Sequence, residues 1–370
     1  MTKDGRARAR DLGLAPGSLP VGQANAITDV PGVRVGHATI IVADSIRTGV
    51  TAIVHDALIG RGRDGRTTLP AGLAIFNGYG KMTGATQIAE LGTIETPVLL
   101  TSTLSVFRAA DALLSCLHEL PEFADRRTLN PVVVETNDSY LSDIWARPIT
   151  LEHVRRALDS AASGPVAEGC VGAGTGTSAL GFKAGIGTSS RQVMLGSGQS
   201  ATVGALVQAN FGGRLTVLGV KVPVLPGPAA AGPGSTGATA PDHGAPAGNS
   251  CVIVLATDAG LDSRALERLA ARAFGAMART GSDFSGSSGD YALAFSTAAT
   301  ATAVGATPGV PAKDLDLLFT AALEATEEAI LNSLFMAVTT TGYGGHVRHA
   351  VPLDQIRALV TGRSADRSAS

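Results

Sequence analysis

The residues best suited to covalent chemistry in this chain surround Ser250. Ser250 stands where a Pro-, Gly- and Ala-rich segment ends and the short apolar strand Cys251–Ala256 begins. If the chain cuts itself between Asn249 and Ser250, the new terminus carries a hydroxyl and an amine on one residue. A terminal amine has a pKa of about 7.7–8 in model peptides, which suits a general base. The sequence therefore predicts self-cleavage into residues 1–249 and 250–370, with Ser250 as the nucleophile.

A second polar pair, Ser288 and Asp290, follows further along the chain. Residues two apart on a strand face the same side, so Asp290 could orient Ser288 and Ser288 could hydrogen-bond Ser250. A Ser-Gly-Asp sequence is also typical of a turn, and the pair taken alone favours that interpretation.

Three more polar residues are candidates for contacting a substrate. Glu135 ends the apolar strand Pro131–Glu135, and its carboxylate could bind a substrate ammonium group. Asn137 and Asn210 are neutral donors near Gly-rich turns, and either could direct an amide N–H at a developing oxyanion. The ordinary alternatives are a solvated strand end or helix cap for Glu135 and loop hydrogen bonds for the two asparagines.

Composition argues against several other classes of protein. The chain has 370 residues, a formal net charge of -2 and no basic stripe interleaved with aromatic residues, so nucleic acid is not an expected partner. The longest apolar runs have strand length, so no membrane helix is expected. Three cysteines without a CxxC pair indicate neither a disulfide framework nor a zinc knuckle. A charged start without an apolar signal-peptide run predicts a cytoplasmic protein.

The sequence predicts neither a cofactor nor a metal site. Gly172–Gly176 lacks the Gly-Lys-Ser/Thr ending of a P-loop, so these glycines indicate close backbone packing that could line the site. His346 and His349 have the spacing of metal ligands on a helix. The glycines just before them argue against a helix, so we expect surface histidines.

The elements that position these residues are helices and paired strands. Helices are expected over 85–91, 105–118, 150–162, from Ser263 to a stop at Gly281, and from Pro311 to about Met336. Short strands are expected within 26–60 and over 73–77, 97–101, 131–135, 201–210, 215–221, 251–256 and 291–296. Residues 223–249 are rich in Pro, Gly and Ala and are expected to form a flexible surface linker. The pairing of strands favours stacked sheets with helices outside over a regular parallel βαβ array.

A set of ordered motifs resembles a known family. The motifs are Ala26–His37, Ile94–Pro97, Thr103–Val106, Glu135–Asp138, Gly172–Gly176, Gly185–Arg191, Asn210–Gly213, Ser250 with its strand, and Ser288–Asp290. Together they resemble the DmpA/BapA-type aminopeptidases, which comprise the L-aminopeptidase/D-amino-acid esterase-amidases and the β-peptidyl aminopeptidases. The likeness runs from about residue 8 to the region of Gly345.

This resemblance implies a fold and an assembly. The fold would be a single four-layer αββα sandwich, like that of N-terminal-nucleophile hydrolases but connected differently. The precursor would cleave itself between Asn249 and Ser250, and the two products would stay together. Family members usually form homotetramers of such heterodimers, so the same homo-oligomer is expected here.

The resemblance also implies roles for the candidate residues. Ser250 matches the nucleophile, Ser288 and Asp290 match its Ser/acid partners, and Glu135 matches the carboxylate that holds the substrate's amine. Characterised members have Glu where this chain has Asp290. Asn210 matches the oxyanion-hole Asn, and Asn137 falls where some members place a Tyr that assists the oxyanion.

The predicted activity is that of a self-cleaving serine aminopeptidase. It would release the N-terminal residue from short peptides, amides or esters, with D- or β-aminoacyl substrates included, through an acyl-enzyme and without a cofactor. One alternative is an endo-amidase or acyltransferase of the same fold, both of which we expect to use Thr as nucleophile. The other is a non-catalytic small-molecule-binding protein in which Ser250 never becomes a chain terminus.

Overall fold

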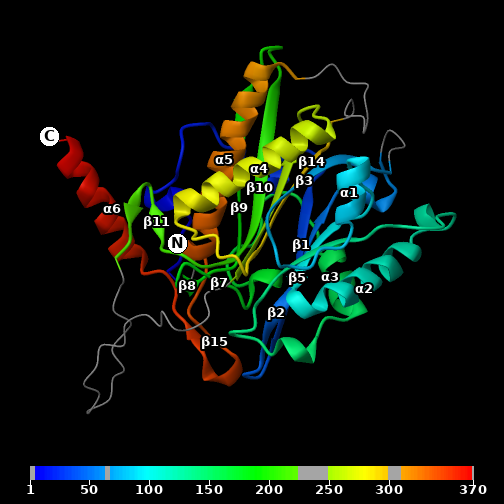
Figure 1. The fold of residues 1–370 in the computed structure, drawn as a ribbon, viewed down its shortest axis with the longest axis horizontal. Helices are drawn as coiled ribbons and strands as arrows, with labels where there is room; N and C mark the ends of the chain where they lie inside the picture. Colours follow the sequence, from blue (N-terminus) through cyan, green and yellow to red (C-terminus); the bar gives the residue numbers. More distant parts are fainter. Residues whose placement is uncertain (1–4, 63–66, 224–248, 299–309, 369–370) are drawn as a thin grey trace.

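Two β-sheets face each other and carry helices on their outer sides (Figure 1). The computed structural model describes residues 5–62, 67–223, 249–298 and 310–368. The smaller sheet has the spatial order β1 (Arg34–Val42), β2 (Ile46–Val54), β5 (Val98–Ser102), β6 (Val132–Thr136). The larger sheet has the order β4 (Thr93–Ile94), β3 (Leu69–Gly78), β14 (Gly289–Ser296), β13 (Asn249–Thr257), β10 (Ser200–Phe211), β9 (Ile186–Met194). Each sheet has one parallel pair, β5 with β6 and β13 with β14.

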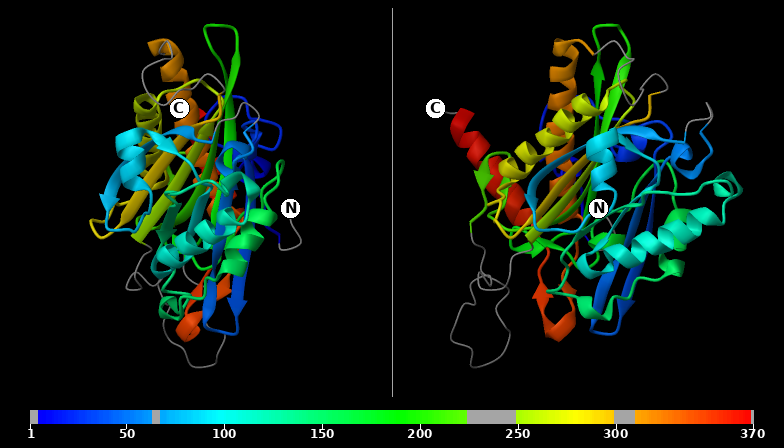
Figure 2. Two further views of the ribbon diagram at one scale, coloured as in Figure 1. Left: turned by 90° about the vertical axis from the view of Figure 1, so that its right-hand side faces the viewer. Right: turned by 45° about the vertical axis from the view of Figure 1, so that its right-hand side comes forward.

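The long helices lie on opposite sides of this pair of sheets. Helices α2 (Val106–His118) and α3 (Leu151–Asp159) cover the smaller sheet, whereas α4 (Ser263–Thr280) and α5 (Ala312–Phe335) cover the larger one (Figure 1). The short helix α1 (Ala85–Leu91) follows β3. Helix α6 (Leu353–Ser368) lies at the edge of the molecule beside the hairpin of β11 (Thr216–Val217) and β12 (Val220–Lys221) (Figure 2). Two further hairpins are β7 (Ser178–Ala179) with β8 (Phe182–Lys183) and β15 (Thr340–Thr341) with β16 (Val347–Arg348).

Alternation along the strands produces three separate hydrophobic cores. In β13, Val252 and Val254 pack between the two sheets, whereas Ile253 and Leu255 pack toward α4 and α5. In β6, Val133 belongs instead to the core under α2 and α3. Because successive side chains of a strand point to opposite faces, one strand contributes residues to two cores. Three cores separate four layers, which confirms the predicted αββα sandwich.

Local signals in the sequence set the helix ends. The Asp262 carboxylate accepts a hydrogen bond from the main-chain N of Ala265 at 2.8 Å and caps α4. Gly281, with a φ of 104°, ends that helix in the left-handed conformation that glycine tolerates. Thr150 precedes α3 and Pro311 precedes α5, as predicted. None of the helices in the described ranges is both long and apolar enough to cross a bilayer.

Three predictions about secondary structure need correction. The segment 215–221, predicted as one strand, is the β11–β12 hairpin, because Leu218 and Gly219 both have positive φ angles and reverse the chain. The Gly-dense region 181–191, for which no strand is predicted, contains most of strand β9 (Ile186–Met194). Helix α6 was not predicted. The linker predicted over 223–249 falls almost entirely on residues 224–248, which lie outside the described residues.

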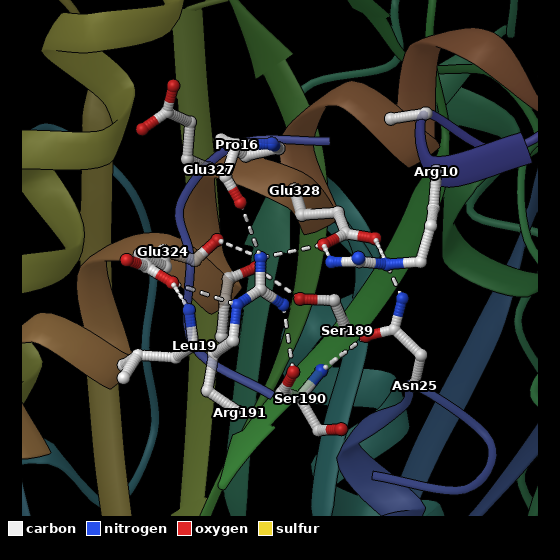
Figure 3. Close-up of polar contacts among 12 residues, drawn as sticks. Arg10, Pro16, Leu19, Asn25, Ser189, Ser190, Arg191, Glu324, Glu327 and Glu328 are labelled. Atoms are coloured by element: carbon white, nitrogen blue, oxygen red, sulfur yellow. Dashed lines mark hydrogen bonds and ion pairs between the residues drawn. The ribbon is translucent and has the colours of Figure 1, made fainter. Parts of the chain in front are cut away.

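The N-terminal segment is tied to the larger sheet by a buried cluster of charged groups centred on Arg191 (Figure 3). From β9, the Arg191 guanidinium donates to Glu324 Oε2 at 3.1 Å and to Glu328 Oε2 at 2.7 Å, both on α5. Arg10 and Asn25, from the N-terminal segment, also donate to the Glu328 carboxylate. Burial alone would raise the pKa of Glu328, but Arg191 and these other donors lower it below its usual value.

Candidate active site

Ser250 lies at the start of β13, on the face that the strand turns toward the smaller sheet. It is 2% exposed. Its Oγ accepts two hydrogen bonds, one from the main-chain N of Asn137 at 3.0 Å and one from Asn210 Nδ2 at 3.2 Å. The register of β10 against β13 sets Asn210 directly opposite Ser250, while Asn137 comes just after the end of β6. Strands from both sheets therefore bring the predicted nucleophile and both predicted donors together.

The two asparagines are held in fixed orientations. Asn210 Oδ1 accepts from the main-chain N of Ser178 at 3.0 Å, and its Nδ2 also donates to Asn137 O at 2.9 Å. The Asn137 side chain accepts from the main-chain N of Ser139, so it stabilises the local turn. Residue 137 thus faces Ser250 with its backbone N–H, a donor that any residue type except proline supplies.

Ser288, just before β14, and Asp290, on that strand, form a hydrogen-bonded pair. Ser288 Oγ donates to Asp290 Oδ1 at 2.7 Å, and Asn77 Nδ2 donates to Asp290 Oδ2 at 2.9 Å. Burial raises the pKa of Asp290, and these two hydrogen bonds oppose the rise. The register sets Gly289 opposite Ser250, so the pair flanks the nucleophile. Within the described residues no hydrogen bond joins Ser288 to Ser250. No pattern in the sequence singles out Asn77.

The peptide bond predicted to break lies within an ordered strand. Asn249 is the first residue of β13 and pairs with Phe211 of β10. Its side-chain Nδ2 donates to Ser287 Oγ at 3.0 Å. The residues on both sides of the bond are therefore fixed by neighbouring strands and loops, although the preceding segment lies outside the described residues.

Glu135 supplies a buried carboxylate with one oxygen unused. Its Oε1 accepts from the main-chain N of Lys81 at 3.0 Å and lies 3.7 Å from Lys81 Nζ. Its Oε2 is buried and accepts no hydrogen bond from the described residues. Burial raises the pKa of Glu135, with Lys81 and the nearby Thr103 hydroxyl acting in the opposite direction. A buried acceptor without a partner is costly, so the arrangement suits a ligand cation.

Several of these groups line one cavity of ≈ 160 Å³, although Asn210, Ser288 and Asp290 are not among its lining residues. Glu135, Asn137, Asn249 and Ser250 line it, as the site hypothesis requires. Tyr79, Gly80 and Lys81, from the loop after β3, and Thr103, after β5, also line it and were not predicted. The Gly-rich loop over 78–84 was visible in the sequence, but nothing local showed that it enters this cavity.

Asp138, next to Asn137, is a further buried carboxyl group near the site. It is 1% exposed. Burial raises its pKa to about 7, although the Thr48 and Ser102 hydroxyls beside it oppose the rise. The negative charge of Glu135 adds to the effect. No pattern in the sequence singled out this residue.

Other predicted features lie elsewhere. Gly172–Gly176 does not line the cavity but packs closely, since a Cβ on Gly174 would meet the main-chain N of Ile186 at 2.4 Å. His346 is exposed, stacks on Tyr140 and lies in a non-helical segment, as expected. Among the described residues, no group of three or more His, Cys, Asp or Glu side chains could hold a metal ion.

The facing sheets, their outer helices and the strand-borne serine define a protein with the N-terminal-nucleophile hydrolase fold. Comparisons with known proteins give the family. The model of peptidase family S58 matches residues 25–348. The chain therefore belongs to peptidase family S58, and it is a serine-type aminopeptidase.

Individual relatives agree with this assignment over nearly the whole chain. The chain is 41% identical to the β-peptidyl aminopeptidase BapA of Sphingosinicella microcystinivorans, over 95% of this chain and 91% of that protein. The structure of the PH0078 protein from Pyrococcus horikoshii matches with a TM-score of 0.83 and 40% identity, covering 97% and 99% of the two chains. The L-aminopeptidase D-Ala-esterase/amidase of Ochrobactrum anthropi, described as a prototype for the serine aminopeptidases, matches with a TM-score of 0.82 and 37% identity, covering 96% and 99%.

Proposed function

We propose that this aminopeptidase activates itself by cleavage between Asn249 and Ser250. Ser250 Oγ would attack the Asn249 carbonyl, the C–N bond would break as the ester forms, and water would then hydrolyse the ester. The products are a carboxylate on Asn249 and a free amine on Ser250. The fixed position of Asn249 beside Ser250 supports this step, because a reaction between neighbouring groups gains most when both are held in place.

The freed amine would then serve as the base for substrate hydrolysis. It takes the proton from Ser250 Oγ as Oγ attacks the substrate carbonyl, and passes that proton to the leaving nitrogen. The main-chain N–H of Asn137 and Nδ2 of Asn210 would stabilise the oxyanion formed beside Oγ. The pair of Ser288 and Asp290 flanks Ser250 and would orient the amine. Water resolves the acyl-enzyme, so residues of the chain and water account for every step.

The observation that carries this proposal is the shared cavity of Ser250 and Glu135. One wall holds a nucleophile with two N–H donors, and another holds a buried carboxylate with an unused oxygen. That oxygen would bind the ammonium group of a substrate and so require a free amine. We propose short peptides, amides and esters as substrates, with D- and β-aminoacyl groups among them, since relatives are named for acting on both.

The proposal predicts strong discrimination against a blocked amine. Alanine p-nitroanilide and its N-acetyl derivative should be compared with the purified two-chain protein. We expect the acetylated compound to react at least about a hundredfold more slowly, because it would leave the Glu135 carboxylate without a partner. Equal rates would remove Glu135 from this role. Ser250→Ala should abolish both chain cleavage and hydrolysis, and a Ser250→Ala protein that retained either one would refute the nucleophile assignment.

We also propose that the two products remain together in one αββα domain and that four such pairs assemble into a homotetramer in the cytoplasm. The Arg191 cluster supports the first point, because it joins Arg10, Asn25 and Arg191 of the longer product to Glu324 and Glu328 of the shorter one. Large exposed side chains such as Phe76, Phe107 and Trp145 support further association. Light scattering should give four times the mass of the 37.2 kDa chain. A single two-chain unit at micromolar concentration would contradict the tetramer, and cell fractionation tests the location.

A further inference from the structure

The cavity carries a cation that the proposed mechanism does not use. Lys81 lies in the loop between β3 and α1, with Nζ 3.7 Å from Glu135 Oε1. The Lys81 side chain is 37% exposed, whereas that of Glu135 is 2% exposed. Both residues line the cavity that holds Ser250. The cavity wall therefore presents a positive and a negative group side by side.

Both members of this pair keep capacity for a ligand. Glu135 Oε2 accepts no hydrogen bond from the described residues. An ammonium group has three N–H donors, and among the described residues Glu135 is the only anion that Lys81 Nζ contacts, at a distance beyond a normal hydrogen bond. The Tyr79 ring, 5.9 Å from Nζ, is the other group that the cation approaches.

The ligand that complements such a pair carries an ammonium and a carboxylate on the same carbon atom. Its ammonium would bind Glu135 Oε2 and its carboxylate would bind Lys81 Nζ, so the four charges alternate in sign. A neutral group beside the amine would give Lys81 no new partner, and a cationic group would repel it. The closest fit is a first residue whose carboxylate stands on the same carbon as its amine.

A residue of this kind must be linked through its side chain. In an α-linked residue the carbonyl on the amine-bearing carbon is the scissile one, so no free carboxylate can stand on that carbon. A β-linkage puts one more carbon between the amine and the scissile carbonyl than an α-linkage does. A β-linked residue with its carboxylate on the amine-bearing carbon is a β-aspartyl residue.

We propose that the substrates of this enzyme include β-aspartyl peptides, with Lys81 as the specificity-determining residue that binds the α-carboxylate. This inference rests on the proposed function, because it uses the same nucleophile and the same ammonium site. The β-amide C–N bond breaks as the ester to Ser250 Oγ forms, and the Oγ proton passes to the leaving amine. Water then splits the ester, which releases aspartate and restores the hydroxyl.

Three dipeptides with one leaving group test the substrate class. They are β-aspartyl-leucine, 3-aminobutyryl-leucine, which has a methyl group in place of the carboxylate, and α-aspartyl-leucine. For the two-chain enzyme we expect kcat/KM for β-aspartyl-leucine to exceed that of each of the other two by about tenfold. Lys81→Met should lower the ratio of the β-aspartyl to the 3-aminobutyryl value by about tenfold, and Lys81→Arg should keep it within threefold.

The ratio compares two substrates on one preparation, so loss of folded protein cancels. Lys81→Gln is a second uncharged variant for the same measurement. Faster cleavage of 3-aminobutyryl-leucine or α-aspartyl-leucine than of β-aspartyl-leucine by the unaltered enzyme would overturn the substrate class, as would a ratio that Lys81→Met and Lys81→Gln leave unchanged. Both results would leave the proposed function intact, whereas no cleavage of any dipeptide or of alanine p-nitroanilide would contradict the proposed function itself.

Discussion

Arg191 and Glu135 are both buried charged residues, yet the protein surrounds them differently. All three nitrogens of the Arg191 guanidinium donate hydrogen bonds (Figure 3). Both oxygens of its partner Glu328 accept hydrogen bonds, Oε2 from Arg191 and Arg10 and Oε1 from Arg10 and Asn25. Glu135 is almost as buried, but among the described residues its Oε1 is bonded to Lys81 whereas its Oε2 accepts no hydrogen bond. The pKa values of the two carboxyl groups differ in the same way: that of Glu328 is lowered and that of Glu135 is raised.

The contrast distinguishes two kinds of buried charge: ion pairs that stabilise the fold, and charged groups that can still bind a ligand. A buried charge whose bonds are all made within the protein fixes the position of the elements that carry it. A buried charge with an open oxygen destabilises the free protein, and binding of a cation removes that cost. The comparison predicts that altering the first kind changes stability and altering the second changes activity.

The largest effect should come from breaking the Arg191 cluster. Arg191→Met leaves two carboxylates of α5 with fewer partners, and removing one member of a buried ion pair typically costs about 3–5 kcal/mol. We expect the melting temperature to fall by about 5 °C. Lys81→Met is the matched control, since its side chain is partly exposed, and it should change the melting temperature by less than about 2 °C. Equal melting temperatures for the two variants would contradict the comparison.

The next largest effect should come from replacing Glu by Gln at two positions, which should change activity at one and stability at the other. Glu135→Gln should lower kcat/KM for alanine p-nitroanilide by about a hundredfold, because an amide cannot balance the substrate ammonium, and it should leave thermal stability nearly unchanged. Glu328→Gln should do the reverse, with a lower melting temperature and a normal kcat/KM per folded enzyme. Steady-state kinetics and thermal melts on both proteins measure this. If Glu328→Gln lost activity while Glu135→Gln kept it, the assignment of roles would be wrong.

A smaller effect concerns pH and the second buried carboxyl group, Asp138. Its folded pKa of about 7 lies above its ordinary value of 3.8, so the stability that protonation contributes is lost as pH rises toward 7. The Asp138→Asn side chain cannot ionise. From pH 5 to pH 8, the free energy of unfolding of this variant should therefore rise by about 2 kcal/mol relative to that of the unaltered protein. Urea denaturation at both pH values tests this, and a pH-independent difference would contradict it. For Glu328 the sign is opposite, because its lowered pKa gives stability that is lost in acid.

Much of the fold was predictable because the signals are local. The apolar periodicity of 106–118, the Asp262 cap and the Gly281 stop each act within one or two helical turns. Strand β9 was missed because residues 187–190 are Gly, Thr and Ser rather than branched apolar residues. Its glycine is required by tertiary packing, since a Cβ on Gly187 would meet Ala329 O of α5 at 1.9 Å. The sequence does not show which helix will lie there.

In the candidate site too, residues in local motifs could be predicted, whereas residues brought in by tertiary packing could not. Ser250, Asn210, Glu135 and Ser288 were identified from motifs and strand ends, and the structure sets them around one end of the two sheets. Asn137 contacts Ser250 through its backbone N–H, and a backbone group cannot be predicted from the residue type. Lys81, Asn77 and Asp138 come from segments whose approach to the site depends on how β3 and β6 pack, so local patterns could not select them.

The central claim, that Ser250 becomes a chain terminus, is tested most directly by intact-mass spectrometry of purified enzyme with measured aminopeptidase activity. The account predicts two polypeptides, residues 1–249 and 250–370, with serine at the start of the shorter one. Full activity in a preparation that contains only the uncut 370-residue chain would contradict it.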